Sequence, residues 1–347
     1  MAGPGAHAML SAMPSSTDRH TSRAADTASA PAAAPRAERS WTLRTLGLVA
    51  LIAAISGAVV ATTCSRRAAP PEPGTSRLSG MMLDPQLSEI SGLAASHRHA
   101  DVLWMHDDGG NPERLFAVST QGDRLATLRI EGVTKTDWED IAAFDLDGRH
   151  YLLIADTGDN GGLRRSLQLH VIEEPEKIEN ARLKPAWSIA FRWPDGARDC
   201  EAVAVDIARK QVLLISKKRQ PPELFSVPLM PAGNALQTAT KVGELAGIPQ
   251  ADEALRKSNP TRAKLQGQIT SADISPDGKT LAVMTYRYLL LYPRQSGQSW
   301  AQAVAGAPKV RDLPWLPQAE ALGWSADGLS LYATGEFIPA PLYRIAP

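Results

Sequence analysis

The sequence has little of what several classes of protein require. Only two of its 347 residues are cysteines, too few for a disulfide framework or a cysteine-rich zinc site. Lys and Arg total 37, and Asp and Glu also total 37, so there is no basic excess with which to bind nucleic-acid phosphates. We therefore expect no nucleic-acid partner. Hydrophobic residues make up 44% and charged residues 21%, which is ordinary for a globular protein with a core.

The charge is distributed unevenly along this neutral chain. The first 80 residues contain eight arginines and four acids, a net charge of +4, so the remainder carries −4. Residues 1–45 are mostly Ala, Pro, Ser and Thr with no apolar period. Such a segment cannot bury enough surface to offset its ordering entropy, which predicts a disordered tail.

Residues 46–63, LGLVALIAAISGAVVATT, contain no charged residue. As a helix this segment would be roughly 27 Å long, about the thickness of a bilayer core. It could be an uncleaved signal anchor, a cleaved secretory signal, or a lipoprotein signal ending at Cys64. Each interpretation exports the rest of the chain. We expect a bacterial cell-envelope protein on the extracytoplasmic side, anchored through residues 46–63 or secreted after cleavage, with the Pro-rich residues 64–76 as a linker.

Residues 77–347 repeat one pattern five times. Each unit opens with a polar residue and a short strand of small and apolar residues. A turn, a strongly apolar strand and a third strand follow, and four units offer a fourth. The units begin about 50 to 70 residues apart, near the length of a four-stranded propeller blade. The opening strands read LSEISGLAAS (87–96), DWEDIAAFD (137–145), DCEAVAVD (199–206), QITSADIS (268–275) and QAEALGWS (318–325).

This recurrence predicts an all-β fold, a β-propeller of about five four-stranded blades. The last unit ends after its third strand, and an unpaired run over residues 76–83 precedes the first unit. We expect that run to be the outer strand of the last blade, because ring closure removes exposed sheet edges. A sixth blade would require a degenerate unit in residues 245–267, which are more typical of an inserted loop or short helix. A β-sandwich does not explain the recurrence.

Two polar positions, two residues apart, recur in the opening strands. In a propeller these strands line the central channel, and residues two apart on a strand point to the same side. All ten residues are polar and six are acids, so we expect an acidic mouth at one end of the channel. Converging carboxylates must be protonated, paired with basic residues or bound to a cation. The pairs are Glu89/Ser91, Asp137/Glu139, Asp199/Glu201, Gln268/Thr270 and Gln318/Glu320.

Oxygen ligands in this number favour calcium, Ca²⁺, which takes about six to eight oxygens, over zinc. The ends of two apolar strands add acids in Asp/Gly/Asn loops, Asp107 in HDDGGN and Asp156 in DTGDNGG. The alternative is that the acids cap turns or pair with basic residues such as Lys217 and Lys218. The candidate calcium ligands are Glu89, Asp107, Asp137, Glu139, Asp156, Asp199, Glu201 and Glu320.

Four strings in this chain carry a resemblance to known proteins. They are E-x-S-G-L at 89–93, W-x-H-D-x-G at 104–109, D-W-E-D-I-A at 137–142 and D-x-G-D-N at 156–160. The chain resembles exported bacterial propellers of the SdiA-regulated and esterase-like, phytase-like groups, and more distantly the gluconolactonase type, over residues 80–347. In the last type, acid and amide side chains hold one Ca²⁺ that activates the ester or water. The resemblance implies that role for Glu89, Glu139 and Glu201.

Two functions remain open. One is a monomeric binding module whose acidic, Ca²⁺-binding mouth takes a ligand or a protein of the cell envelope. The other is a Ca²⁺-dependent hydrolase of esters, lactones or phosphoesters, in which the metal polarises the scissile group and Glu139 or His106 moves the proton. The sequence contains no nucleophile motif such as G-x-S-x-G, so we favour the binding module.

Overall fold

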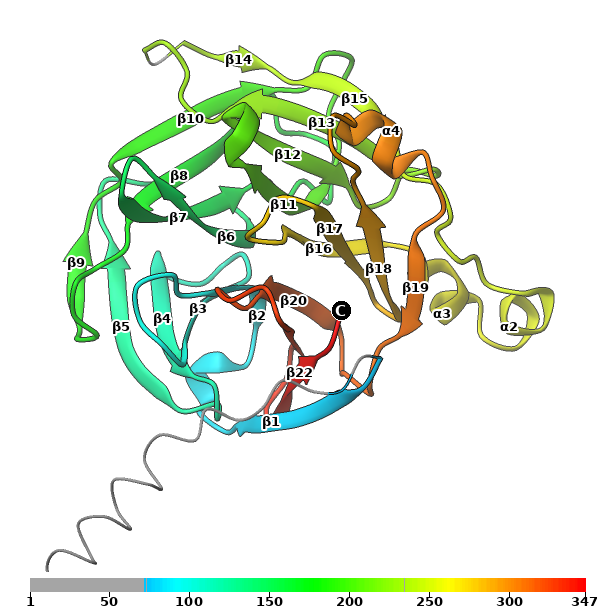
Figure 1. The fold of residues 1–347 in the computed structure, drawn as a ribbon, viewed down its shortest axis with the longest axis horizontal. Coiled ribbons are helices and arrows are strands. Elements are labelled where there is room, and N and C mark those ends of the chain that lie inside the picture. The colour runs from blue at the N-terminus through cyan, green and yellow to red at the C-terminus, as the bar shows by residue number, and fades with distance from the viewer. Residues whose placement is uncertain (1–71, 73, 234) are drawn as a thin grey trace, which may run out of the picture. The chain divides into compact units, whose positions relative to one another are not determined.

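A computed structural model describes residue 72 and residues 74–233 and 235–347. The expected tail (1–45), the hydrophobic segment (46–63) and most of the linker (64–76) lie outside the described residues. Five sheets are arranged in a ring, which confirms the all-β, five-bladed propeller (Figure 1). None of the helices in the described part of the chain has the length and hydrophobicity needed to cross a membrane.

Each sheet begins at the centre of the ring with the small and apolar strand that opens a sequence unit. These inner strands are buried along nearly all of their length because neighbouring sheets cover both faces. Small side chains suit this position, since the inner strands lie against one another around the axis. The inner strands are β2 (Ile90–Ala95), β6 (Trp138–Leu146), β11 (Cys200–Asp206), β16 (Ile269–Ile274) and β20 (Ala319–Trp324).

The second and third strands extend each sheet outward and carry much of the core that packs between adjacent blades. The second strands are β3 (Val102–Asp107), β7 (Arg149–Asp156), β12 (Gln211–Ser216), β17 (Thr280–Thr285) and β21 (Leu331–Gly335). The third strands are β4 (Arg114–Ser119), β8 (Leu167–Glu173), β13 (Glu223–Pro228), β18 (Tyr288–Pro293) and β22 (Ala340–Ile345).

A fourth strand completes every blade, and two blades carry a fifth strand that four-stranded repeats do not predict. The extra strands are short segments between the third and fourth strands of blades two and three, and they pair in parallel with the outer edges of blades one and two. The fourth strands are β5 (Arg124–Ile130), β10 (Trp187–Arg192), β15 (Thr240–Glu244), β19 (Lys309–Asp312) and β1 (Ser76–Met82). The fifth strands are β9 (Ala181–Leu183) on β5 and β14 (Gln237–Thr238) on β10.

The ring is closed by β1, which is the outer strand of the last blade. It pairs antiparallel with β22, with Ser76 opposite Ile345 and Met82 opposite Ala340. The Ala346 amide also donates to the Thr75 carbonyl at 3.0 Å. The closure predicted from residues 76–83 is therefore confirmed, and it pairs the edge that β22 would otherwise expose.

The remaining elements are short helices in the connections between strands. Residues 245–267 form α2 (Glu253–Ser258) and α3 (Pro260–Leu265) rather than a sixth blade. The others are α4 (Trp300–Val304), η1 (Pro85–Leu87) and η2 (Ile207–Arg209).

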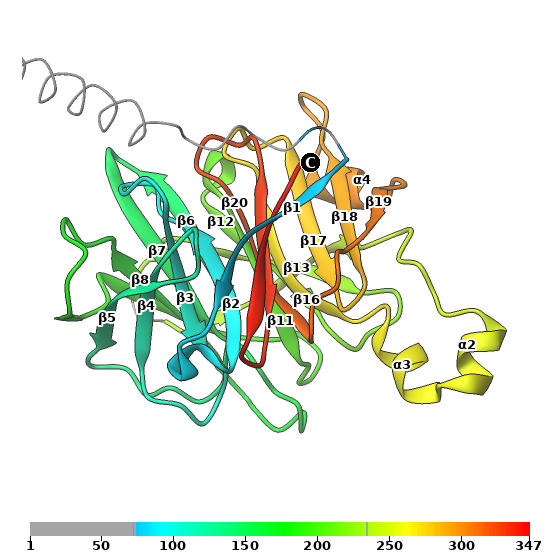
Figure 2. The same ribbon diagram turned by 90° about the horizontal axis from the view of Figure 1, so that it is seen from below.

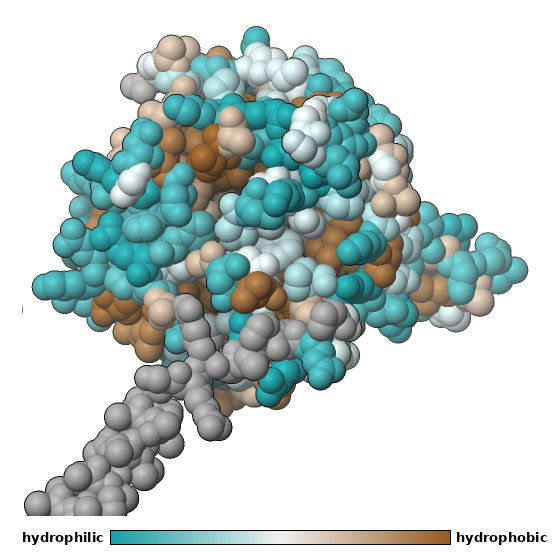
Figure 3. Space-filling view, in the orientation of Figure 1, coloured by the Kyte–Doolittle hydropathy of each residue, from teal (hydrophilic) through white to brown (hydrophobic). Residues whose placement is uncertain are grey.

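We call the face at which the inner strands begin the proximal face, and the face at which they end the distal face. Helices α2 and α3, which lead into β16, lie toward the proximal face, and the C-terminus lies toward the opposite one (Figure 2). In the orientation of Figure 1, hydrophilic residues surround smaller hydrophobic areas on the surface of the ring (Figure 3).

Candidate functional site

All five inner strands carry a β-bulge at the same place. In each, the pairing with the second strand skips one residue directly after the first pair. A bulge re-aims the side chain of the unpaired residue, here near the proximal end of the channel. All five of these residues are at most 8% exposed. They are Ser91, Glu139, Glu201, Thr270 and Glu320, the second polar position of the sequence repeat.

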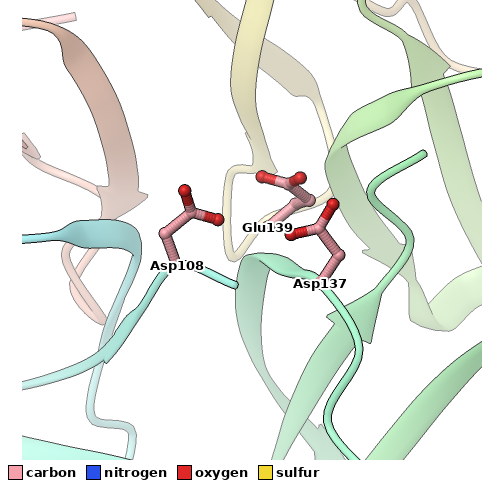
Figure 4. A group of neighbouring side chains, drawn as sticks. All are labelled: Asp108, Asp137 and Glu139. Atoms are coloured by element: carbon pink, nitrogen blue, oxygen red, sulfur yellow. The ribbon is translucent and has the colours of Figure 1, made fainter. Parts of the chain in front are cut away.

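Two overlapping groups of acids gather at this end of the channel. In the first group, carboxylate oxygens of Asp108, Asp137 and Glu139 lie within 4.8 Å of one another. Figure 4 shows their side chains pointing toward a common space, Asp108 from the end of β3 and the other two from the start of β6. The second group joins Glu139 to Asp199 and Glu201 by the same distance. Glu139 therefore belongs to both groups.

The second group contains its own positive charges, from two lysines that follow β12. The Lys217 ammonium pairs with Glu201, and Lys218 Nζ lies 2.7 Å from Asp199 Oδ2. Asp199 Oδ1 also accepts the Asp159 amide at 2.8 Å. These acids are therefore neutralised largely by the protein itself.

The first group has no such partner. Within the described residues, no Lys, Arg or His forms an ion pair with Asp108, Asp137 or Glu139. Burial, followed by the Asp108 charge, raises the pKa of Asp137 to about 6. Burial and the neighbouring Glu201 raise the pKa of Glu139 well above its usual range. At neutral pH this group must therefore hold protons or attract a cation.

Two glycines bring backbone close to these carboxylates. A Cβ at Gly158 would lie 2.1 Å from Glu139 Oε1 and 2.4 Å from Asp137 Oδ2, and one at Gly109 would lie 2.2 Å from Asp137 Oδ1. The Gly158 amide donates to the Asp137 carbonyl at 3.2 Å. Any side chain at Gly158 would occupy the space beside the carboxylates, so the loop that follows Asp156 borders the site through its backbone, whereas the loop after β3 also supplies the Asp108 side chain.

Two candidate ligands from these loops are engaged elsewhere. Asp107 is buried and pairs with Arg114 Nη2 at 2.8 Å. Asp156 pairs with Arg164 Nη2 at 2.7 Å and accepts the amides of Thr136 and Asp137 at 2.8 and 3.1 Å. Asp156 therefore fixes the backbone that presents Asp137, without belonging to either group of acids.

Glu89 and Glu320 lie at the proximal end of the channel, but outside both groups. Glu89 Oε2 accepts the Asn111 side-chain amide at 2.6 Å. Glu320 Oε1 accepts the Tyr286 hydroxyl at 2.6 Å. Burial and the Glu320 charge raise the pKa of nearby Glu336 to about 8. The structure thus brings together four of the eight candidate ligands, which are Asp137, Glu139, Asp199 and Glu201.

His106 is fully buried beneath the proximal end of the channel. Its Nδ1 lies 3.0 Å from the Asp107 carbonyl, and its ring meets Trp138 edge-on with centroids 5.7 Å apart. A Cβ at Gly92 would lie 2.5 Å from its Nε2, so the imidazole fills space that only glycine leaves. Burial lowers the pKa of His106 to about 4, which keeps the ring neutral.

Sequence reasoning missed two acids, Asp108 and Asp140. The sequence pattern pointed to Asp107 at the end of the apolar strand, whereas the neighbouring Asp108, in the loop after β3, is the residue whose carboxylate joins the group. Asp140 is fully buried, and its Oδ2 accepts the amides of Val203 at 2.9 Å and Ala272 at 3.2 Å, in two other blades. Each inner strand is the edge of its sheet, and the amides on its unpaired side need hydrogen-bond acceptors. By accepting two of them, Asp140 links three blades. The only feature of the sequence that marks Asp140 is its position as an acid within an apolar strand.

No protein-family model matches the sequence, and no curated protein does. Among solved structures, the chain is similar to one in the crystal structure of a nidogen/laminin complex. The two share 15% sequence identity with a TM-score of 0.39, over 71% of this chain and 72% of that chain. A likeness of this degree carries no information on ligand, partner or activity, so these must be argued from the site.

Proposed function

We propose that the protein is a calcium-dependent binding module. Asp108, Asp137 and Glu139 hold a Ca²⁺ ion at the proximal end of the channel, and the loaded mouth takes a ligand or a partner. The observation that supports this is the convergence of three carboxylates from two blades without a basic side chain paired to them in the described chain. A divalent cation would supply the missing positive charge.

The donor atoms suit Ca²⁺. They are hard oxygen ligands, and neither group of acids includes a His or Cys that would favour zinc. Three side chains supply fewer oxygens than the about six to eight that Ca²⁺ takes. The remaining positions would be open to water or to a carboxylate, phosphate or hydroxyl oxygen of a ligand. Recognition through the ion would then select oxygen-rich ligands.

We place this activity outside the cytoplasm, in the cell envelope. The support is the uncharged segment 46–63, which would export and tether or release the ring. Extracellular calcium modules work with weak sites, with dissociation constants of about 0.1 to 1 mM. A site with three carboxylates and open positions fits that regime.

One observation favours the hydrolase as a second candidate. Burial and the Glu320 charge raise the pKa of Glu336 to about 8, so this carboxyl group holds a proton at neutral pH, and it lies close enough to Asp108 for that charge to contribute to the rise. A proton donor next to a Lewis-acidic ion is what metal-assisted hydrolysis of an ester, lactone or phosphoester requires. His106 has no exposed surface from which to reach a substrate in this arrangement.

The test measures the calcium content and melting temperature of the full-length protein, with Ca²⁺ and with a chelator. We expect about one Ca²⁺ per chain and a melting temperature roughly 5 °C higher with the ion. Both effects should disappear in Asp137→Asn and in Glu139→Gln. The matched control is Glu131→Gln, an acid of the same β5–β6 connection that pairs with Arg182 at 3.0 Å, and it should behave as wild type.

A panel of simple esters, lactones and phosphoesters separates the two functions. Turnover that requires Ca²⁺ and is lost in Glu336→Gln would establish the hydrolase. Calcium binding without turnover supports the binding module. An unchanged melting temperature and no bound calcium would reject the cation site, and both functions with it.

A further inference from the structure

A separate cavity of about 420 Å³ lies at the distal end of the channel. This volume is in the range of small-molecule sites, about 300 to 1,000 Å³. All five blades contribute to its lining, among others with His97, Phe144, Asp206, Asp273 and Trp324. The cavity therefore sits on the axis of the ring, at the opposite end from the acidic groups described above.

Asp273 is an exception within the repeat. Counted three residues along each inner strand from the bulge, the other four blades have only alanine or glycine. Small residues at this level allow neighbouring inner strands to approach closely, as Gly323 does against Leu93 and Ala94, and the fourth blade alone places an acid there. The equivalent residues are Ala94, Ala142, Ala204 and Gly323.

Asp273 is also the one acid lining this cavity that has no basic partner among the described residues. Its Oδ2 accepts the Trp324 amide at 2.8 Å. Burial raises the pKa of Asp273 to about 7, as expected for a carboxylate without a counter-charge. The other lining acids are paired, Asp145 with His97 at 3.1 Å, Asp206 with Arg294 at 3.3 Å and Asp277 with Lys279 at 3.3 Å.

We propose that the distal cavity binds a small organic cation, an alkylammonium or guanidinium group, whose charge pairs with Asp273. One free carboxylate suits a single positive charge, whereas the calcium site proposed above has three carboxylates for a divalent ion. The aromatic residues Phe144 and Trp324 in the lining favour an organic cation with an apolar part. This site is distinct from the proposed calcium site and does not depend on it.

A purely structural role for Asp273 makes a different prediction. If the residue only accepts the Trp324 amide, an asparagine would serve equally, since its side-chain oxygen accepts the same hydrogen bond. The two roles differ in charge alone. Asp273→Asn therefore keeps the contact within the fold and removes the counter-ion for a ligand.

The experiment is calorimetric titration of the full-length protein with butylammonium and butylguanidinium, and with pentanol as an uncharged probe of similar size. We expect saturable binding of at least one cation, no binding of pentanol, and an affinity about tenfold or more lower in Asp273→Asn. Asp277→Asn, which removes a paired acid from the same lining, should stay within about twofold of wild type. N-acetyllysine methylamide tests whether the cation can belong to a peptide side chain rather than a free amine.

A second variant keeps the test independent of Asp273. Ala326→Trp places a large side chain at an exposed position of the cavity lining and should block binding without touching the carboxylate. Binding that survives in both variants, equal binding of pentanol, or no saturable binding of either cation would overturn the proposal. Loss of binding in Glu139→Gln instead would locate the cation at the proximal acids and overturn it as well.

Discussion

The two groups of acids at the proximal end of the channel share Glu139 but are neutralised differently. The group formed with Asp199 and Glu201 is paired with Lys217 and Lys218. The group formed with Asp108 and Asp137 has no ion pair in the described chain. Equal numbers of carboxylates at similar spacing therefore do not make equal sites. We expect a bound cation in the first group, to which the described part of the chain supplies no paired positive charge of its own.

Lys217, the counter-ion of Glu201, keeps its positive charge. Burial would lower the pKa of the Lys217 ammonium, but Glu201, Tyr286 and Glu320 outweigh that effect and hold the pKa above its usual range. Lys217 therefore stays charged at any physiological pH. It occupies the second group much as a metal ion would occupy the first.

The largest expected effect comes from removing this built-in charge. Lys217→Met leaves Glu201 buried without its partner and should lower the free energy of unfolding by about 3 kcal/mol in the absence of calcium. Lys218→Met is the control, because this lysine is 42% exposed and should cost at most about 1 kcal/mol. Denaturant unfolding measures both. In the double variant, calcium should bind to the second group too, and a stoichiometry unchanged from wild type would contradict our comparison.

The next effect concerns the space inside the first group. Gly158→Ala places a Cβ against Glu139 and Asp137 and should weaken calcium binding about 100-fold. Gly161→Ala tests the same loop at a position where the added Cβ meets only Leu163, at 3.4 Å. Calcium titration of the two variants should give opposite results. Equal affinities would show that the ion does not sit beside Gly158.

The stability of the calcium-free protein should depend on pH in a defined direction. A raised carboxyl pKa means that folding favours the protonated form. This stabilisation is complete below about pH 4 and is lost as the pH rises through about 6 for Asp137. Because Ca²⁺ replaces protons in the first group, it should raise the melting temperature less at about pH 5 than at about pH 8. A calcium effect that is equal at both pH values would count against this site.

The smallest effect is expected from the paired group. Asp199→Asn keeps an oxygen for the Asp159 amide and removes a charge that Lys218 already neutralises. Its calcium affinity should stay within about threefold of wild type, while Glu139→Gln should abolish binding. Calcium titrations of the two variants, checked by circular dichroism for an intact fold, give the comparison. A large loss in Asp199→Asn would move the ion to the second group.

The fold could be predicted from the sequence because its signal is local and repeated. Five small and apolar strands, each followed by a strongly apolar one, predicted the blades, and the unpaired run at 76–83 predicted how the ring closes. The fifth strands of two blades were not predictable. They are two- and three-residue segments whose pairing depends on where a connection passes an outer edge.

The site was predictable in position but not in detail. Alignment of the repeat identified Glu139 and Glu201 at equivalent places, and these are the places where the bulges occur. Simple alternation along a strand cannot describe a bulge, so it did not anticipate that Asp140 would bind amides from other blades. Nor could the sequence indicate which acids lack a partner, because it does not show that Lys217, at the end of β12, meets Glu201 on the neighbouring β11 of the same blade.

The pairing of β1 with β22 has a topological consequence. It sets Ser76 opposite Ile345, so the ring is continuous in space although the chain is cut at this blade. The packing between blades does not require the cut to be there. A chain joined across these two ends and opened in another connection between blades, for example between β5 and β6, should form the same ring as a circular permutant. Removal of β1, in contrast, would leave β22 as an unprotected edge and invite pairing with a second molecule.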